Sequence, residues 1–149
     1  MKKEGRYRRI YIQLEELLQK TEDPIARMAS ICAVLYHKMK HHFWTGFYLL
    51  KGDKLIIGPY QGPLACQELE KEKGVCWATI QAETPIIVPD VEAFPGHIAC
   101  DSRAQSEITV PVFNAHGKVC AVLDVDSDQL NAFDDADRAY LLKIADLIY

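Results

Sequence analysis

Strong charge of one sign and long apolar runs are both missing from this sequence. Its 149 residues contain 17 lysines and arginines against 21 aspartates and glutamates, a formal net charge of −4. We therefore expect no nucleic-acid partner and no attraction to anionic lipid. No stretch reaches the roughly 18 apolar residues of a membrane-spanning helix, and no apolar signal core follows the N-terminus. The sequence predicts a cytoplasmic protein without membrane contact.

The common nucleotide and metalloprotease signatures are also absent. There is no P-loop, no G-x-G-x-x-G and no H-E-x-x-H motif, and neither internal repeats nor low-complexity tracts occur. A chain of this length fits one domain, residues 1–149, which is large enough to bury its own core. We expect it to need no cofactor.

Cysteine, in contrast, is present in an informative number. The sequence has five: Cys32, Cys66, Cys76, Cys100 and Cys120. An odd count in a reducing cytosol argues against a structural disulfide framework. A zinc site is disfavoured because no C-x2-C knuckle is present and the spacings match no common site, so we expect no metal. The ligands considered for it are Cys66, Cys76, His97 and Cys100. Redox-active thiols and thiols that simply pack both remain as interpretations.

Helical periodicity is found at both ends of the chain. Residues 7–19 have apolar side chains at helical spacing, and Asp23-Pro24 is a typical start for a second helix. The expected buried stripe of that helix is Ile25, Met28, Ile31, Cys32 and Leu35. We interpret Cys32 as a core thiol, and His37 and His41 as solvated surface residues. A closing helix is capped around Asp134, with an inner stripe of Ala136, Tyr140, Leu141, Ile144 and Leu147.

Between these helices the period changes to that of strands. Residues 43–50 and 54–60 are expected to form a hairpin through Lys51-Gly52-Asp53. Trp44, Gly46 and Tyr48 would share one face of the first strand. This face is either part of a packed core or a shallow slot for the methyl or methylene groups of a ligand.

A second thiol lies in the segment that follows. Residues 61–65 are expected to form a loop ending at Cys66, and residues 67–73 to be solvated and mobile. A short helix is predicted over residues 74–82, which places Cys76 in its first turn, where the helix dipole would favour a thiolate. Residues 85–89 are predicted to form a short strand.

Residues 94–107 form the most informative stretch, F-P-G-H-I-A-C-D-S-R-A-Q-S-E. Its polar side chains could not all be satisfied inside a core, and apolar strands flank it, so we expect a loop held between rigid elements. The thiol of Cys100 is the first candidate for chemistry in this loop.

The final hairpin places several carboxyl groups together. Strands are expected at 108–112 and 118–126, joined by a four-residue turn at 114–117. Pairing of Phe113 with Lys118 would put Glu107 directly across from Asp124, with Asp126 on the same face. Like charges in opposition are destabilising, so a ligand or a reaction is one explanation and solvated edge carboxylates are the other. Crowding raises the pKa of such groups, so one could act as a proton donor.

A loop thiol, two further thiols and an acidic cluster favour reduction of a small molecule. One thiolate attacks an electrophilic atom, the acid protonates the departing oxygen, and a resolving thiol forms a disulfide. An external dithiol must then reduce that disulfide. Hydrolysis by a Cys-His pair is the weaker alternative, because His97 has no evident orienting partner in the sequence.

Several motifs also occur in an order that resembles the free methionine-(R)-sulfoxide reductases, which are built on the GAF domain. They are F-W-T-G-F-Y (43–48), G-P-L-A-C (62–66), K-G-V-C (73–76), F-P-G-H-I-A-C-D (94–101), S-E-I-T-V-P (106–111) and V-L-D-V-D-S (122–127). The resemblance covers roughly residues 10–149. It implies an α+β fold with a six-stranded antiparallel sheet flanked by helices, usually as a homodimer. It also implies reduction of free L-methionine (R)-sulfoxide, with thioredoxin reducing the resulting disulfide.

The resemblance also implies roles for individual residues. Cys100 matches the nucleophilic thiol, Cys66 its resolving partner, and Cys76 a third cysteine that could relay or substitute. The acidic residues that match those binding the sulfoxide oxygen and the ammonium group are Glu107, Asp124 and Asp126. The residues that match the aromatic wall around the S-methyl group are Trp44 and Tyr48. Trp77 departs from the family, which commonly has a small residue there. A GAF domain that only senses a small ligand is the alternative function.

Overall fold

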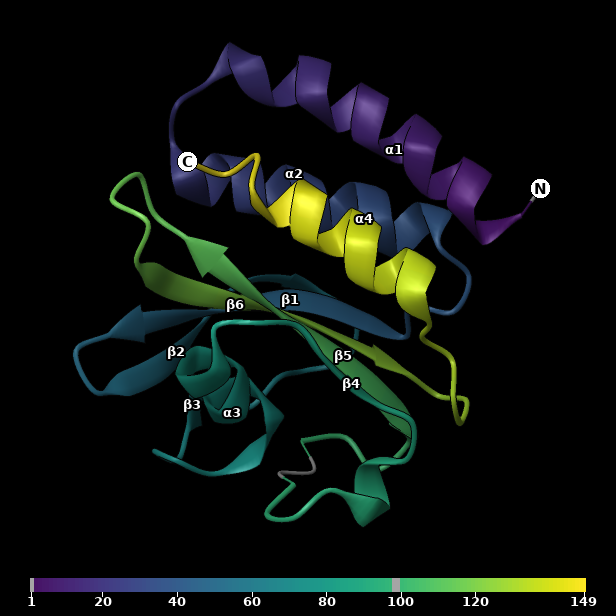
Figure 1. Cartoon of the computed structure of the whole chain (residues 1–149), viewed down its shortest axis with the longest axis vertical. Coiled ribbons are helices and arrows are strands. Elements are labelled where there is room, and N and C mark those ends of the chain that lie inside the picture. The colour runs from purple at the N-terminus through teal and green to yellow at the C-terminus, as the bar shows by residue number, and fades with distance from the viewer. Residues whose placement is uncertain (1, 98–99) are drawn as a thin grey trace.

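The computed structural model describes residues 2–97 and 100–149. Over these residues six strands form one antiparallel sheet in the order β3-β2-β1-β6-β5-β4 (Figure 1). The strands are β1 (Trp44–Lys51), β2 (Lys54–Gln61), β3 (Glu68–Leu69), β4 (Ile86–Val88), β5 (Ser106–Phe113) and β6 (Val119–Ser127). The expected α+β class with a six-stranded antiparallel sheet is confirmed. Ile98 and Ala99 of the F-P-G-H-I-A-C-D motif lie outside the described residues.

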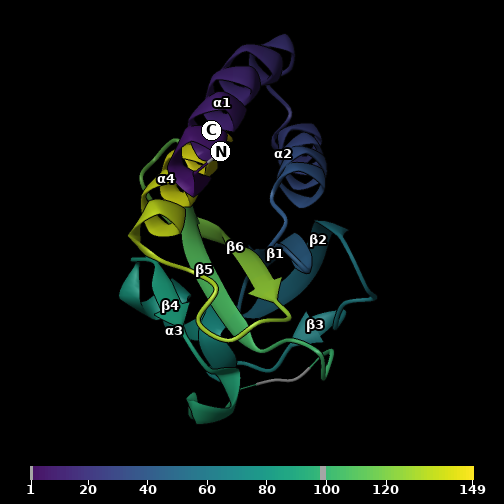
Figure 2. The ribbon, with the colours of Figure 1, turned by 90° about the vertical axis from the view of Figure 1, so that its right-hand side faces the viewer.

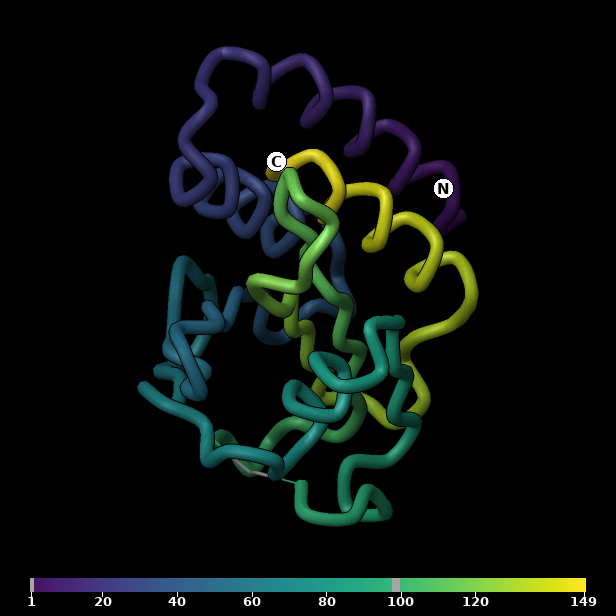
Figure 3. The backbone as a smooth tube through the Cα atoms, turned by 60° about the vertical axis from the view of Figure 1, so that its left-hand side comes forward, coloured from purple at the N-terminus to yellow at the C-terminus, as the bar shows by residue number. Residues whose placement is uncertain are grey.

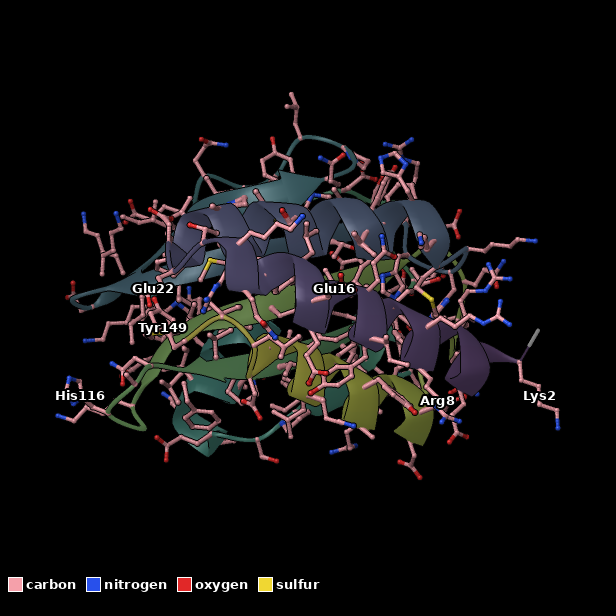
Figure 4. The ribbon with its side chains drawn as sticks, turned by 90° about the horizontal axis from the view of Figure 1, so that it is seen from above. Lys2, Arg8, Glu16, Glu22, His116 and Tyr149 are labelled. Carbon is pink, nitrogen blue, oxygen red and sulfur yellow. A yellow bond between two sulfur atoms is a disulfide. The ribbon has the colours of Figure 1, made fainter. Side chains whose placement is uncertain are left out.

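Three helices cover one side of the sheet: α1 (Lys3–Leu17), α2 (Pro24–Lys38) and α4 (Asp135–Ala145). Figure 2 shows α2 and α4 next to the sheet and α1 above them, and α3 (Gly74–Ala82) on the opposite side. Seen from above in Figure 4, α1 lies in front of α2 and α4, with Lys2 and His116 at opposite ends of the molecule. None of the helices in the described residues is long and apolar enough to cross a membrane.

The helices form where the apolar periodicity predicted them, except that some of their ends differ. The first helix begins at Lys3, four residues earlier than expected, and ends in a 3-10 turn at Leu18–Lys20. Asp23 caps α2 by accepting a hydrogen bond from the amide of Ala26, and Cys32 is buried as expected. Ile25 is a correction: it is 47% exposed, because the buried stripe of α2 begins one turn later.

Side chains alternate between the two faces of the central strands, apart from the bulge at Cys120. The apolar residues that pack against the three helices are Phe47, Ile108, Val110, Val112, Ala121, Leu123 and Val125. Trp44, Tyr48 and Val122 point the other way and pack with Cys76 and Trp77 of α3. The predicted division of β1 into two faces is therefore confirmed. The sheet separates a large helical core from a smaller core around α3.

The pairing of β5 with β6 differs from the expected register by two residues. Glu107 lies opposite Asp126, and Thr109 lies opposite Asp124. The turn contains one residue fewer than predicted, because the amide of Asn114 donates to the carbonyl of Lys118 and Gly117 adopts φ +75°. A bulge at Cys120 adds the second residue of the shift. A shift of two keeps every side chain on its predicted face.

The segment after Cys66 is more ordered than its composition predicts. Glu68–Leu69 pairs with β2 as the edge strand β3, and Leu69 is buried. The other six residues of the stretch 67–73 are exposed, as expected, so the correction concerns the short strand and its buried leucine. Burial of the one leucine fixes a short strand that six polar neighbours conceal in the sequence. The predicted helix over residues 74–82 and the short strand before residue 90 are both confirmed.

A buried polar network joins the ends of α1 and α4 to the chain between α2 and β1. The carboxylate of Asp137 accepts hydrogen bonds from the hydroxyl of Tyr7 (2.5 Å) and the ammonium of Lys3 (2.7 Å). His41 Nε2 lies 2.7 Å from the same carboxylate, so His41 is not the solvated residue that its spacing predicted. Burial by itself would raise the pKa of Asp137, but the bonds from His41, Lys3 and Tyr7 together lower it well below its ordinary value.

Removing the Asp137 charge should destabilise the fold strongly. Asp137→Asn leaves the Lys3 ammonium and the Tyr7 hydroxyl with a poorer partner in a fully buried position, which we expect to cost about 3–5 kcal/mol. Asp135→Asn is the matched control, because that carboxylate lies in the first turn of the same helix and is fully exposed. The control should change stability by less than about 0.5 kcal/mol. Urea unfolding measures both, and equal midpoints for the two variants would contradict the role of Asp137.

Candidate active site

A hollow opens on the side of the sheet that faces α3. Its walls come from β1, β5 and β6, from α3, and from the loops 61–66 and 94–107. The hollow and the solvent-filled space at its open mouth together measure about 630 Å³. Figure 3 shows the two loops approaching each other at the lower end of the molecule.

A disulfide between Cys66 and Cys100 closes one side of this hollow. The two residues are 34 positions apart in the sequence, and their Cα atoms are 5.4 Å apart. Cys66 is half-buried and Cys100 is exposed, so an external reagent can approach the bridge from the Cys100 side. The structure therefore brings together the two thiols that the sequence assigned to attack and resolution.

The three predicted carboxyl groups lie together on the floor of the hollow. Glu107 and Asp124 are 5% and 6% exposed, and Asp126 is half-buried. Among the described residues, Glu107 Oε1 and Asp124 Oδ1 are buried without any hydrogen-bond partner. A buried polar oxygen without a partner is costly, which indicates that these atoms serve a ligand instead of the fold.

Burial and mutual repulsion change the titration of all three groups. Burial, followed by the charge of Asp126, raises the pKa of Glu107 to about 8. The pKa of Asp124 is raised well above its ordinary value by burial and by Glu107, and that of Asp126 by burial and by Asp124. The cluster therefore retains protons at neutral pH and can donate one, as the sequence predicted.

Cys76 lies beside this carboxyl cluster, inside the hollow, and not at the mouth of the hollow. Its sulfur and one carboxylate oxygen each of Glu107 and Asp124 are within 4.8 Å of one another. The expectation that the α3 dipole makes Cys76 a thiolate is wrong. Burial, together with the neighbouring carboxyl groups, raises the pKa of Cys76 well above its ordinary value. A dipole worth up to about 1 kcal/mol cannot offset that desolvation.

The imidazole of His97 forms part of the wall near Glu107. Its Nε2 is 3.6 Å from Glu107 Oε1, and its side chain is 15% exposed. Burial lowers the pKa of His97, and Asp124 opposes this shift, so the ring is neutral near pH 7. The sequence showed no partner for His97, and the structure places it beside Glu107 on β5. The position of His97 is therefore explained without the Cys-His pair of a hydrolase.

Aromatic rings form the wall on the β1 side. Trp44 and Tyr48 both line the hollow, with their ring centroids 6.0 Å apart. The indole of Trp44 donates to the carbonyl of Pro63 (2.9 Å), and the hydroxyl of Tyr48 donates to that of Cys66 (3.2 Å). These bonds hold the Cys66 loop against the strand. The space over Gly46 is filled by the indole, because a Cβ there would lie 2.4 Å from the ring, so the predicted slot is not open at that point.

Several further residues line the hollow without having been expected there, among them Phe43, Leu64 and Lys73. Phe43 contacts the guanidinium of Arg103, whose carbon lies 4.9 Å from the ring centroid. Leu64, at the mouth, is 84% exposed, and Lys73 lies beside the start of α3. Their only signal in the sequence is that each stands inside one of the motifs that carry the family resemblance. Exposure of a large apolar side chain cannot be read from such a position.

Comparisons with known proteins place this arrangement in a family. The GAF domain profile matches residues 14–148. The free methionine-R-sulfoxide reductase of Saccharomyces cerevisiae is 37% identical over 131 residues, covering 83% of this chain and 73% of that protein. The X-ray structure of free methionine-R-sulfoxide reductase from Neisseria meningitidis in complex with its substrate has a TM-score of 0.94 and 39% identity, covering 99% of this chain and 89% of that one. The chain belongs to the GAF-domain family of free methionine-R-sulfoxide reductases.

The family resemblance inferred from the motifs is therefore confirmed. A further relative, GAF domain-containing protein A of Dictyostelium discoideum, is 45% identical and covers 98% of this chain and 92% of its own. The departure at Trp77 does not affect the hollow in the described structure. Its indole is buried and donates to the carbonyl of Leu69 (3.4 Å), and it is not among the described residues that line the hollow.

The stability of this reductase-family fold should depend on pH through Glu107. The folded protein holds a proton on Glu107 up to about pH 8, whereas an unfolded glutamate releases it near pH 4.3. The free energy of unfolding should therefore fall between about pH 5 and 8, by on the order of 1 kcal/mol per pH unit. Glu107→Gln should flatten this decline, whereas Glu92→Gln, at an exposed position, should keep it. Urea unfolding of the oxidised protein measures the slopes, and an unchanged slope in Glu107→Gln would refute the assignment.

Proposed function

We propose that this protein reduces free L-methionine (R)-sulfoxide to L-methionine. The observation that supports this most directly is the Cys66–Cys100 disulfide at the mouth of a hollow whose floor consists of proton-bearing carboxyl groups. A sulfoxide reductase requires both parts, because the sulfur must receive two electrons while its oxygen is protonated. The yeast and Neisseria relatives are named for this activity.

The hollow offers complementary groups to each end of the substrate. The unpartnered oxygens of Glu107 and Asp124, with Asp126 beside them, would bind the ammonium group and the sulfoxide oxygen. Trp44 and Tyr48 would form the wall around the S-methyl group. The protonated member of the cluster donates to the sulfoxide oxygen, and the ionised members pair with the ammonium group.

The chemistry proceeds in two balanced steps. The Cys100 thiolate attacks the sulfoxide sulfur, and with proton transfer from the acid cluster the oxygen leaves on Cys100 as a sulfenic acid, releasing methionine. The Cys66 thiol then attacks the Cys100 sulfur and expels water, which forms the disulfide. Cys76 could relay or substitute for Cys66, although its buried thiol is a poor nucleophile in this state.

Recycling requires an external dithiol, for which we propose thioredoxin. The exposed Cys100 sulfur gives such a reductant a point of attack. A cytoplasmic location and a homodimeric state, both expected from the sequence, belong to the same proposal. Mass spectrometry of the reduced protein before and after treatment with methionine sulfoxide tests the reaction itself. A loss of two hydrogens is expected, and an unchanged mass would favour a GAF domain that only binds ligand.

Cys100→Ser should abolish turnover, because a hydroxyl is a far weaker nucleophile than a thiolate. We expect a loss of at least about 1,000-fold in methionine formation with a thioredoxin system and NADPH, measured for each sulfoxide epimer. Cys120→Ser is the control, because this half-buried cysteine lies outside the described lining of the hollow. An active Cys100→Ser protein would refute the assignment of the nucleophile.

Cys66→Ser should separate the first turnover from recycling. The variant should release about one methionine per chain and then stop with Cys100 as a sulfenic acid, because no disulfide is available for thioredoxin to reduce. Rapid quench with quantification of methionine measures this stoichiometry. Sustained turnover with thioredoxin would show instead that Cys76 resolves the sulfenic acid.

A further inference from the structure

Cys76, Glu107 and Asp124 form a cluster that the reductase proposal uses only in part. The thiol sulfur and one oxygen of each carboxyl lie within 4.8 Å of one another, and all three side chains are buried. In a tetrahedral site with metal–ligand distances of 2.0–2.3 Å, neighbouring ligand atoms are about 3.5 Å apart. Shifts of about 1 Å therefore suffice to bring these atoms onto one ion.

Two unpartnered oxygens point to a cation at this position. Glu107 Oε1 and Asp124 Oδ1 have no hydrogen-bond partner among the described residues. His97 Nε2 stands 3.6 Å from Glu107 Oε1, too far for a good hydrogen bond, so it does not satisfy that oxygen. One sulfur and two carboxylate oxygens form a ligand set that suits zinc, with the fourth tetrahedral position left open.

The nearby basic side chains do not neutralise these acids. Lys73, on the rim of the hollow, pairs with Glu70 at 2.9 Å. Arg103 pairs with Asp101 at 2.7 Å. A divalent cation would supply the positive charge that these two basic side chains do not give to the carboxyl groups.

A second group of possible ligands consists of His41, His42 and Asp137. Unlike Glu107 and Asp124, these side chains already have partners. Asp137 already receives hydrogen bonds from Tyr7 and Lys3. His42 Nε2 lies 3.1 Å from the Tyr7 hydroxyl. An ion there would have to displace a complete network and approach an ammonium group.

We propose that the hollow binds one zinc ion through Cys76, Glu107 and Asp124. The sequence predicted no metal, because Cys66, Cys76, His97 and Cys100 have no C-x2-C knuckle and match no common spacing. In the structure Cys66 and Cys100 are joined to each other, and the candidate ligands are a different set. Binding forms a zinc–thiolate bond and releases the protons of Cys76 and of the carboxyl cluster to solvent. The site stands on its own geometry. Zinc would also exclude methionine sulfoxide, because it would occupy the carboxyl groups of Glu107 and Asp124; this part of the proposal rests on the proposed function.

Isothermal titration of the oxidised protein with zinc chloride tests the site, because Cys66 and Cys100 cannot then act as ligands. One ion per chain is expected. Replacing zinc with cobalt(II) should give a thiolate-to-cobalt charge-transfer absorption, which reports a sulfur ligand in the unmodified protein. Lack of binding, or binding without that absorption, would overturn the proposal. The measurement uses no substrate, so a protein without reductase activity that still binds zinc contradicts only the proposed function.

Variants locate the ion. Cys76→Ser and Asp124→Asn should each weaken zinc affinity by more than about 100-fold, since each removes a direct ligand. Cys120→Ser and His41→Asn are the controls and should bind as the unmodified protein does. Circular dichroism and the mass of the intact disulfide check that each variant is folded and oxidised. Unchanged affinity in Cys76→Ser, or loss of binding in His41→Asn, would place the ion elsewhere and overturn the site.

Discussion

The two-residue alternation along β5 and β6 is the constraint on which both halves of this molecule depend. Apolar side chains of these strands, such as Ile108, Val110 and Leu123, fill the helical core, and Glu107 and Asp124 are carried to the opposite face. A slip of one residue would turn the carboxyl groups into the helical core. The apolar face thus fixes which side of the sheet the acids occupy and offsets the cost of crowding them.

Properties that depend on local pattern were predictable from the sequence. The helix containing Cys76, the first hairpin and the sharing of a face by Glu107, Asp124 and Asp126 all follow from periodicity and turn residues. The direct partner of Glu107 did not, because the turn at Gly117 and the bulge at Cys120 each change the pairing by one residue. The face was nevertheless right, because the two changes together preserve parity.

Properties that depend on tertiary burial were not predictable. His41 looked like a surface residue, because Asp137, its partner, is 96 positions away in the sequence. Cys76 was expected to be a thiolate, because the sequence shows the helix start but not the full burial of its sulfur among acids. The pairing of Cys66 with Cys100 was supplied by family resemblance, since spacing cannot specify which thiols meet.

The smaller core around α3 has an optical consequence. The chain has two tryptophans, and both Trp44 and Trp77 pack in this core together with Cys76 and the half-buried Cys66. The indole of Trp44 also donates a hydrogen bond to the carbonyl of Pro63, three residues before the disulfide-bonded Cys66. Indole emission from this protein therefore originates entirely in the core against which Cys66 packs. Opening of the bridge can be followed by intrinsic fluorescence in unlabelled protein, with no background from the helical layer.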